Sequence, residues 1–353
     1  MPRVLVLPGD GIGPEVTAEA VAVLRQIAPD VDTEDARVGG CAIDAEGAPV
    51  SDETVRRARE TGLVLLGAVG GPKWDPLPPP KRPERGLLRL RKELDLYANL
   101  RPAAVIPALE DASPLRPECV TGVDLLVVRE LTGGIYYGEP RGRQDRDGQR
   151  RALNTMVYDE DEVRRIARLA FRAARDRRKR LTNIHKANVL EVCAFWNEIV
   201  EEVAPDFPDV ELEHLLVDAA SMHLLREAAR FDVVLCPNLF GDILSDEAAM
   251  ITGSLGMLPS ASIGDEGRGL FEPVHGSAPD IAGSDQANPL AAILSVAMLL
   301  EYGLQRLEEA SRVREAVGQF LEDGYRTSDL ASISGGRVVG TREAGKLVRE
   351  ALG

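Results

Sequence analysis

Three consecutive stretches between residues 181 and 246 share one pattern, and this pattern restricts the fold more than any other feature. Each stretch begins with a short, largely apolar run, ends in charged residues, and opens into a helical pattern. The runs cover 181–185, 212–217 and 231–236, and the charged residues after them are Lys186, Asp218, and Asp242 with Asp246. Repeated strand–helix units favour an α/β fold with a parallel sheet, whose strands end at one shared edge. The sequence therefore predicts that these side chains form one site.

The last stretch carries two acids on what reads as one helix face. Asp242 and Asp246 lie four residues apart in Phe240-Gly-Asp-Ile-Leu-Ser-Asp246. Side chains at that spacing point the same way, and like charges there are slightly unfavourable unless a helix N-terminus or a cation compensates them. With Asp218 they offer only hard oxygen ligands, which select Mg²⁺ or Mn²⁺ over Zn²⁺. Three carboxylates around a divalent ion leave a negative charge for other groups to balance.

Three arginines could supply that balance and bind an anionic substrate. Arg129 ends the apolar run 123–129, Arg101 follows in Asn99-Leu-Arg-Pro102, and Arg91 lies in an amphipathic pattern that starts at Glu84. Guanidinium groups bind carboxylates in bidentate fashion. On an amphipathic helix, however, arginines are also common as solvent-facing residues, so the two interpretations stay open on this pattern alone.

Lys186 and Tyr136 complete a set with reactive potential. A lysine beside a metal and arginines could act as a general base, and Tyr136, next to two glycines, could donate a proton. Such a set suits oxidation of a 2-hydroxy acid, where a metal stabilises negative charge on oxygen and eases loss of an adjacent carboxylate. The hydride needs an acceptor, for which the glycine-rich loops 70–75 and 275–283 are candidates.

The N-terminal loop Gly9-Asp-Gly-Ile-Gly13 invites a dinucleotide-binding interpretation, but its spacing does not fit. The fingerprint G-x-G-x-x-G starting at Gly9 needs glycine at position 14, where Pro14 stands. Pro14 suits the first turn of a helix, and Glu15 suits the positive end of its dipole. The loop is therefore predicted to be a tight turn that leads into a helix.

Composition excludes several classes of function. The chain has 353 residues and a net charge of −15, which argues against nucleic acid as the main partner. No apolar run reaches membrane-spanning length, and no N-terminal secretion pattern is visible, so a cytoplasmic protein is expected. The four cysteines show no metal-ligand spacing and are expected to be small buried side chains.

The remaining segments are predicted to form structural elements, and the role of one histidine stays open. A helix is expected over 159–180, another over 289–302, and an exposed arm or hairpin over 138–151 that another subunit could complete. His275 lies in a tight loop and is equally compatible with a structural and a ligand-binding role. The last forty residues show no chemical signal.

Six segments together resemble the isocitrate/isopropylmalate family of β-decarboxylating dehydrogenases, and within it the isopropylmalate branch. The resemblance runs from about residue 3 to residue 302, through Leu7-Pro-Gly-Asp-Gly-Ile-Gly-Pro-Glu15, Gly70-Gly-Pro-Lys-Trp74, Val128-Arg-Glu-Leu-Thr-Gly-Gly-Ile-Tyr136, Lys186-Ala-Asn-Val189, Phe240–Asp246 and His275-Gly-Ser-Ala-Pro-Asp-Ile-Ala-Gly283. It implies NAD-dependent oxidative decarboxylation of (2R,3S)-3-isopropylmalate to 4-methyl-2-oxopentanoate, a step of leucine biosynthesis.

The resemblance also implies an architecture. The expected fold is α/β with two domains and a large central sheet flanked by helices, and it is not a Rossmann dinucleotide fold. The first domain would comprise residues 1–96 and 253–353, and the second residues 97–252. Two chains would form an intertwined homodimer with shared active sites.

Roles follow by resemblance for each matching position. Arg91, Arg101 and Arg129 would bind the malate carboxylates, and Asp242, Asp246 and the Asp218 of a second chain would hold Mg²⁺ or Mn²⁺. Lys186 of the second chain would take the hydroxyl proton, and Tyr136 would protonate C3. Leu87, Leu88 and Val189 would surround the isopropyl group.

Gly71, Glu84 and Asn188 would lie near the nicotinamide. The adenosine half would be held by His275, Gly276, Ser277, Ala278, Pro279, Asp280, Ile281, Ala282, Gly283 and Asn288. Asp280 against the ribose hydroxyls would favour NAD over NADP.

Two alternatives to this function remain. One is the same chemistry on a sibling substrate such as homoisocitrate, tartrate or malate, against which Leu87 and Leu88 argue. The other is a non-catalytic metal- or nucleotide-binding regulator, against which the retained reactive residues argue. Two positions depart from the usual isopropylmalate pattern, His185 before the lysine and Pro237 before Asn238. They bear on substrate preference and on Lys186, and leave the reaction class unaffected.

Overall fold

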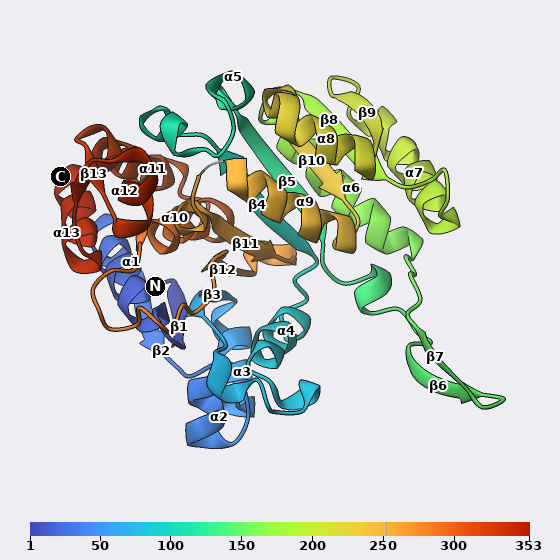
Figure 1. Ribbon diagram of the computed structural model, residues 1–353, viewed down its shortest axis with the longest axis horizontal. Helices are drawn as coiled ribbons and strands as arrows, with labels where there is room; N and C mark the ends of the chain where they lie inside the picture. Colours follow the sequence, from blue (N-terminus) through green and yellow to red (C-terminus); the bar gives the residue numbers. More distant parts are fainter. Residues whose placement is uncertain (252) are drawn as a thin grey trace. The chain divides into compact units, whose positions relative to one another are not determined.

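The computed structural model describes residues 1–251 and 253–353 and divides the chain into two compact units (Figure 1). Unit 1 comprises residues 1–96, 106–114 and the described residues from 253 onward, and unit 2 comprises residues 97–105 and 115–251. Residue 252, the end of the expected second domain, lies outside the described residues. None of the helices in the described part has the length and apolar character needed to cross a bilayer.

Unit 1 is built on five strands in the order β2-β1-β3-β12-β11. Their bounds are β1 (Arg3–Gly9), β2 (Asp32–Asp35), β3 (Leu63–Ala68), β11 (Pro259–Ile263) and β12 (Gly269–Pro273). All neighbours run parallel except β11, which is antiparallel to β12. Strands β1 and β3 are almost continuously apolar because both faces of a parallel sheet are covered by helices.

The helices of unit 1 cover both faces of these strands. Helices α1 (Gly13–Ile27) and α10 (Leu290–Met298) pack on one face, with α11 (Leu307–Glu322) and α13 (Thr341–Leu352) outside them. On the other face α3 (Asp52–Thr61) and α4 (Glu84–Glu93) enclose a core that contains Leu5, Leu66 and Leu270. The smaller elements are α2 (Gly40–Glu46), α12 (Ser328–Ser334), β13 (Tyr325–Arg326) and β14 (Arg337–Val338).

Unit 2 also contains five main strands, in the order β4-β5-β10-β8-β9. Their bounds are β4 (Ala98–Ala104), β5 (Asp124–Glu130), β8 (Arg180–His185), β9 (Glu211–Leu216) and β10 (Val233–Cys236). Strands β5, β10, β8 and β9 are parallel, and β4 is antiparallel to β5. The expected α/β class, with a large mixed sheet flanked by helices, is confirmed.

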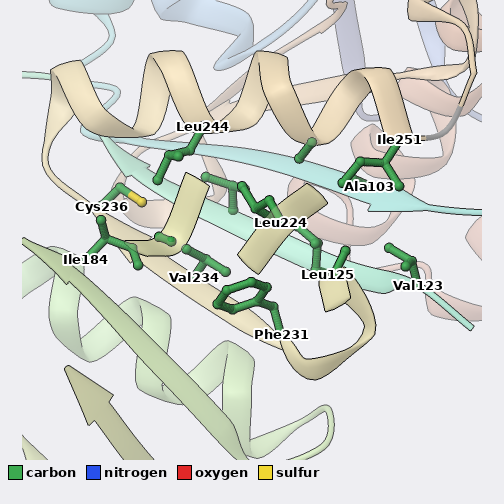
Figure 2. Packing of buried hydrophobic residues seen from close by; sticks show 14 of the residues in the cluster. Ala103, Val123, Leu125, Ile184, Leu224, Phe231, Val234, Cys236, Leu244 and Ile251 are labelled. Carbon is green, nitrogen blue, oxygen red and sulfur yellow. The ribbon is translucent and has the colours of Figure 1, made fainter. Parts of the chain in front are cut away.

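Helices again cover both faces of the unit 2 strands. Helices α6 (Glu160–Arg175) and α7 (Glu191–Val203) pack on one face. On the other, α8 (Val217–Glu227) and α9 (Asn238–Ile251) lie over a core that contains Leu125, Phe231, Val234 and Leu244 (Figure 2). Helix α9 lies along β4 and β5, and a short α5 (Pro117–Val120) contacts α8 (Figure 1).

Three local features can be compared with the predictions from the sequence. The expected hairpin is present, formed by β6 (Gly142–Arg146) and β7 (Gln149–Leu153), and it ends two residues beyond the expected range 138–151. Helix α6 stops at Arg175, before the expected end, because Lys179 takes a left-handed backbone (φ 62°) that leads into β8. Residues 106–114 join unit 1, where the Ala108 carbonyl accepts a hydrogen bond from Arg326 (2.6 Å).

Candidate active site

The polar residues predicted from strand ends lie at one edge of the unit 2 sheet. Because β5, β10, β8 and β9 are parallel, their carboxyl ends are neighbours, with Cys236 level with Arg129 and His185 level with Leu216. Lys186 follows β8, and Asp218 lies in the first turn of α8 directly after β9. Helix α9 starts two residues after β10. The antiparallel β4 brings Asn99 opposite Arg129 at the same edge.

Helix α9 presents the acid pair, and a glycine lets it approach the sheet. Asp242 and Asp246 are one turn apart on α9, with Asp246 the more exposed. A Cβ on Gly241 would stand 2.7 Å from the Arg129 side chain, so only glycine allows Arg129 to pass beneath the helix. The Pro237 carbonyl accepts the Gly241 N–H at 2.8 Å, so this departure from the family pattern is compatible with the helix start.

Two of the predicted arginines are paired with these acids. Arg129 forms an ion pair with Asp242, and its side chain is almost fully buried. Arg101 donates through Nη1 to Asp246 Oδ1 (2.7 Å) and to the Ser245 hydroxyl (2.8 Å), and its Nη2 lies 3.9 Å from Asp242. Two guanidinium groups thus face two carboxylates. A bound divalent ion could pair with the carboxylates, and a substrate carboxylate could pair with the guanidinium groups.

Tyr136 belongs to the same group of side chains. It ends a short 3₁₀ turn after β5, and its hydroxyl donates to Asp242 Oδ2 at 2.8 Å. Partial burial and the bond to the Asp242 carboxylate raise the pKa of the Tyr136 phenol. The group is therefore held in its protonated form, as a proton donor requires.

Lys186 and Asp218 form a second group. The Lys186 ammonium donates to Asp218 Oδ1 at 2.6 Å, and this bond lowers the pKa of the exposed Asp218 carboxyl. His185, the other departure from the family pattern, accepts the Ala187 N–H on Nδ1 (3.1 Å) and so supports the turn after Lys186. Burial, and to a lesser degree the nearby His214, lowers the pKa of the His185 ring, which favours its neutral form. Asn188 and Val189 protrude from this turn into solvent.

The two groups stay apart within one chain. Strand β8 lies on the far side of β10 from β5, and α9 packs toward β4 and β5. Within the described part of the chain, no three His, Cys, Asp or Glu side chains gather as a potential metal site. Asp242 and Asp246 therefore supply two of the three predicted ligands, and their oxygens have the hardness that Mg²⁺ or Mn²⁺ requires.

Unit 1 holds the third arginine. Arg91 Nη2 donates to Glu272 Oε1 on β12 (2.8 Å), and the buried Arg91 Nε has no partner among the described residues. An unpaired buried donor is costly, so a ligand carboxylate at Arg91 would relieve that cost. Leu87 and Leu88 lie half-buried one turn before it on α4.

The glycine loop after β3 lies beside the start of α4. A Cβ on Gly70 would come within 3.0 Å of Glu84 Oε1, and Gly71 has a positive φ of 153°, which residues with a side chain rarely adopt. Gly70 donates its N–H to Asp10 Oδ2 (2.9 Å), and Asp10 also accepts from Gly40 (2.7 Å) and Cys41 (2.7 Å). The Asp10 carboxylate thus joins three segments of unit 1.

The N-terminal glycine loop is the predicted tight turn. The Ile12 N–H donates to the Ser277 carbonyl (2.8 Å), and a Cβ on Gly11 would stand 2.0 Å from that oxygen. Gly11 (φ 58°) is thus needed for close approach to the loop after β12. Helix α1 starts at Gly13 with Pro14 in its first turn.

A cavity of about 220 Å³ lies beside the loop after β12. Ile12, Leu255 and Ile281 give it apolar walls, and His275, Asn288, Ser328 and Asp329 give it polar groups. His275 Nδ1 donates to the Gly276 carbonyl (3.0 Å), and its buried Nε2 has no partner in the described part of the chain. Burial lowers the pKa of this imidazole, so its Nε2 is an unprotonated acceptor. An apolar slot with one unsatisfied acceptor suits the amino-bearing ring of adenine.

The other predicted cofactor residues lie in or next to this loop. Gly276, Ala278, Pro279, Ile281, Ala282 and Gly283 belong to the segment without helix or strand between β12 and α10, and Asp280 is exposed there. The Asn288 side chain donates to Asp329 (3.1 Å) and accepts from the Leu290 N–H (2.9 Å). Both polar atoms of the Asn288 side chain thus form hydrogen bonds within unit 1.

Several residues that support the arginines or line the cavity were not predicted from the sequence. Glu272 orients Arg91, Asn238 binds Arg129, and Ser328 and Asp329 line the cavity although the last forty residues showed no chemical signal. For Glu272, the sequence held one indication of a specific role, namely an acidic residue in the otherwise apolar run Phe271-Glu-Pro273. The remaining contacts join segments far apart in the chain.

Comparisons with known proteins agree along the whole chain. The family model described as isocitrate/isopropylmalate dehydrogenase matches residues 3–348. A 3-isopropylmalate dehydrogenase from Nitratidesulfovibrio vulgaris is 56% identical over 99% of this chain and 99% of its own, and one from Aquifex aeolicus is 54% identical over 99% and 97%. Among solved structures, an isocitrate dehydrogenase from Methylococcus capsulatus has a TM-score of 0.87 at 36% identity and covers 100% of this chain and 99% of its own. A β-decarboxylating dehydrogenase from Thermococcus kodakarensis has a TM-score of 0.83 at 38% identity, over 100% and 96%.

Proposed function

The chain belongs to the isocitrate/isopropylmalate dehydrogenase family, and on this premise we propose that it converts (2R,3S)-3-isopropylmalate to 4-methyl-2-oxopentanoate and CO₂. This oxidative decarboxylation is the leucine-pathway step of its curated relatives at about 55% identity. One observation in the structure carries the proposal. On one sheet edge, Arg101, Arg129 and Tyr136 converge on Asp242 and Asp246.

The arginines bind and orient the substrate. A malate skeleton has two carboxylates, and Arg91, Arg101 and Arg129 are the guanidinium groups available to them. Each is already fixed by a neighbour, Arg91 by Glu272, Arg101 by Asn99 (2.9 Å) and Arg129 by Asn238 (3.1 Å). Fixed donors lose little conformational entropy on binding, so they favour a single substrate orientation.

Two residues move protons. Lys186 loses the ammonium proton to solvent and, as the neutral amine, takes the proton of the substrate hydroxyl during oxidation. Asp218, 2.6 Å away, holds the Lys186 side chain in place between turnovers. After CO₂ has left, Tyr136 gives a proton to C3, and its raised pKa keeps the phenol loaded until that step. Leu87, Leu88 and Val189 contact the isopropyl group, which selects against substrates that carry a third carboxylate.

The proposed reaction also needs a divalent metal ion and NAD. Mg²⁺ or Mn²⁺, held by Asp242, Asp246 and Asp218, supplies positive charge that stabilises negative charge on the substrate oxygen. NAD, held by the loop 275–283 with Asn288 and by Gly71, Glu84 and Asn188, supplies the hydride acceptor. Asp280 repels a 2′-phosphate and so favours NAD over NADP.

The catalytic unit is a homodimer in the cytoplasm. Within the described part of one chain, Asp218 does not gather with Asp242 and Asp246 into one metal site, and we expect a second chain to lend Lys186 and Asp218. Helices α8 and α9 expose large apolar side chains that a partner can cover, namely Met222, Leu225, Ile243 and Met250. The exposed hairpin of β6 and β7 is a further surface for exchange between two chains.

A substrate panel tests the proposal. NADH formation is measured with NAD and Mn²⁺ on isopropylmalate, malate, tartrate, homoisocitrate and isocitrate. We expect kcat/KM to be highest for isopropylmalate by about tenfold or more, because burial of three methyl-sized groups in a leucine pocket discriminates that strongly. Turnover of isopropylmalate no faster than that of malate or homoisocitrate would refute the substrate assignment.

A further inference from the structure

One buried amide lies between the substrate-binding arginine and the turn that carries the proton donor. Asn238 is the first residue of α9 and is 1% exposed. Its Oδ1 accepts from Arg129 Nε (3.1 Å) and Nη2 (2.9 Å), and its Nδ2 donates to the Gly133 carbonyl (3.1 Å). Its backbone N–H donates to the Tyr158 hydroxyl (2.7 Å), which anchors the residue itself.

The turn on the other side of Asn238 is constrained as well. The buried Glu130 carboxylate accepts the Thr132 N–H and the Gly133 N–H, each at 2.8 Å. A Cβ on Gly133 would stand 2.7 Å from the Tyr158 ring, so the turn packs closely on this ring and only glycine fits there. Tyr136 follows three residues later. The Gly133 carbonyl is thus the point at which Asn238 fixes the segment that leads to Tyr136.

Only a carboxamide satisfies both neighbours. An amide accepts on its oxygen and donates on its nitrogen, which matches a guanidinium on one side and a carbonyl on the other. A carboxylate would accept from Arg129 but would place an oxygen against the Gly133 carbonyl, and it would also neutralise the guanidinium. Asparagine therefore orients Arg129 and leaves its positive charge in place.

We propose that Asn238 is a positioning residue that sets the orientation of Arg129 and of the turn leading to Tyr136 together, so that substrate binding and proton donation share one fixed geometry. This inference rests on the proposed function. It predicts that loss of the amide weakens substrate binding through Arg129 and slows protonation through Tyr136. NAD binding stays unchanged, because none of the residues proposed to hold NAD contacts Asn238.

The isosteric variant Asn238→Asp tests the proposal, with Asn183→Asp as its matched control. Asn183 is an equally buried amide of unit 2 that accepts from Trp196 and donates to Asn197, each at 2.8 Å. Both variants replace a buried donor by a carboxylate. The carboxylate at position 238 would pair with Arg129, whereas the one at position 183 would face Trp196, Asn197 and His214, so Asn183→Asp should lose at least as much stability. We expect Asn238→Asp to raise KM for isopropylmalate by about 10- to 100-fold and to lower kcat, with KM for NAD within about twofold. Asn183→Asp should change neither KM.

A second variant and a binding measurement test the proposal if Asn238→Asp does not fold. If Asn238→Asp does not fold, Asn238→Ala, which adds no charge, should show the same increase in KM for isopropylmalate. Titration calorimetry with isopropylmalate should show a matching loss of affinity. Folded Asn238 variants with wild-type constants, or with changes equal to those of Asn183→Asp, would refute the role of Asn238. A wild-type protein without isopropylmalate turnover would instead refute the proposed function.

Discussion

The Tyr136 hydroxyl donates a 2.8 Å hydrogen bond to Oδ2 of Asp242, the acid whose other oxygen is paired with Arg129. One carboxylate therefore links the proton donor to a substrate-binding arginine before any ligand arrives. Because partial burial and this bond raise the pKa of Tyr136, the phenol stays protonated on the alkaline side of its ordinary value. Ionisation of Tyr136 should thus limit activity only above about pH 10.

Tyr136→Phe removes the proton donor and keeps the ring. We expect kcat to fall by about 10²- to 10⁴-fold with little change in KM for isopropylmalate, because general acid catalysis contributes to the rate of a chemical step. Steady-state NADH formation measures both constants. The neighbouring Tyr137→Phe, also a partly exposed phenol, is the control and should retain wild-type rates. Equal rates for the two variants would exclude Tyr136 as the donor.

Asp242→Asn tests the assignment of the metal ligands. The amide keeps the shape of the side chain but loses the charge that a divalent ion needs, so metal-dependent turnover should fall by about 100-fold or more. Circular dichroism should show a wild-type fold. Titration with Mn²⁺ monitored by electron paramagnetic resonance should show weaker binding. A variant with wild-type Mn²⁺ affinity and turnover would contradict the assignment.

Asp280→Lys tests the preference for NAD. An exposed acid in the loop after β12 repels a 2′-phosphate, and a lysine there would attract it. The ratio of kcat/KM for NAD to that for NADP should drop by about tenfold or more. Asp265→Lys, an exposed position of unit 1 outside the loop, makes the same charge change and should leave the ratio unaltered. An unchanged ratio in Asp280→Lys would count against contact with the ribose.

Asp10→Ala tests the structural interpretation of the N-terminal glycine loop. Asp10 is buried and accepts three backbone N–H groups, so its loss leaves three donors without a partner. The free energy of unfolding should decrease by about 3 kcal/mol or more, measured by chemical denaturation. Asp52→Ala, which removes an exposed ion pair with Arg89, should cost less than about 1 kcal/mol. A similar small cost for both variants would show that Asp10 does not hold these segments together.

The sheet edge of unit 2 was predictable from the sequence because it depends on local pattern. Apolar runs followed by helical periodicity imply parallel strands, and parallel strands share their carboxyl edge, so Lys186, Asp218 and the α9 acids had to lie along it. The spacing of Asp242 and Asp246 likewise fixed a shared helix face.

The supporting contacts were not predictable in this way. Arg91 and Glu272 are 181 residues apart in the chain, and Arg129 and Asn238 are 109 apart, so their pairing depends on the order of strands in three dimensions. Asp329 reaches the cavity from a segment whose sequence resembles an ordinary surface helix. Local patterns thus located the reactive groups, and tertiary packing decided what orients them.

The shared active site is the central claim, and a mixed dimer tests it most directly. Lys186→Ala and Asp242→Asn each inactivate a homodimer, because every site then lacks its base or a metal ligand. Chains with different affinity tags are co-expressed, and the heterodimer of the two variants is purified. If Lys186 serves the Asp242 of the other chain, one of its two sites is intact, and kcat should recover to about half of the wild-type value. A heterodimer as inactive as both parents would show that Lys186 and Asp242 act within one chain, and would contradict the account.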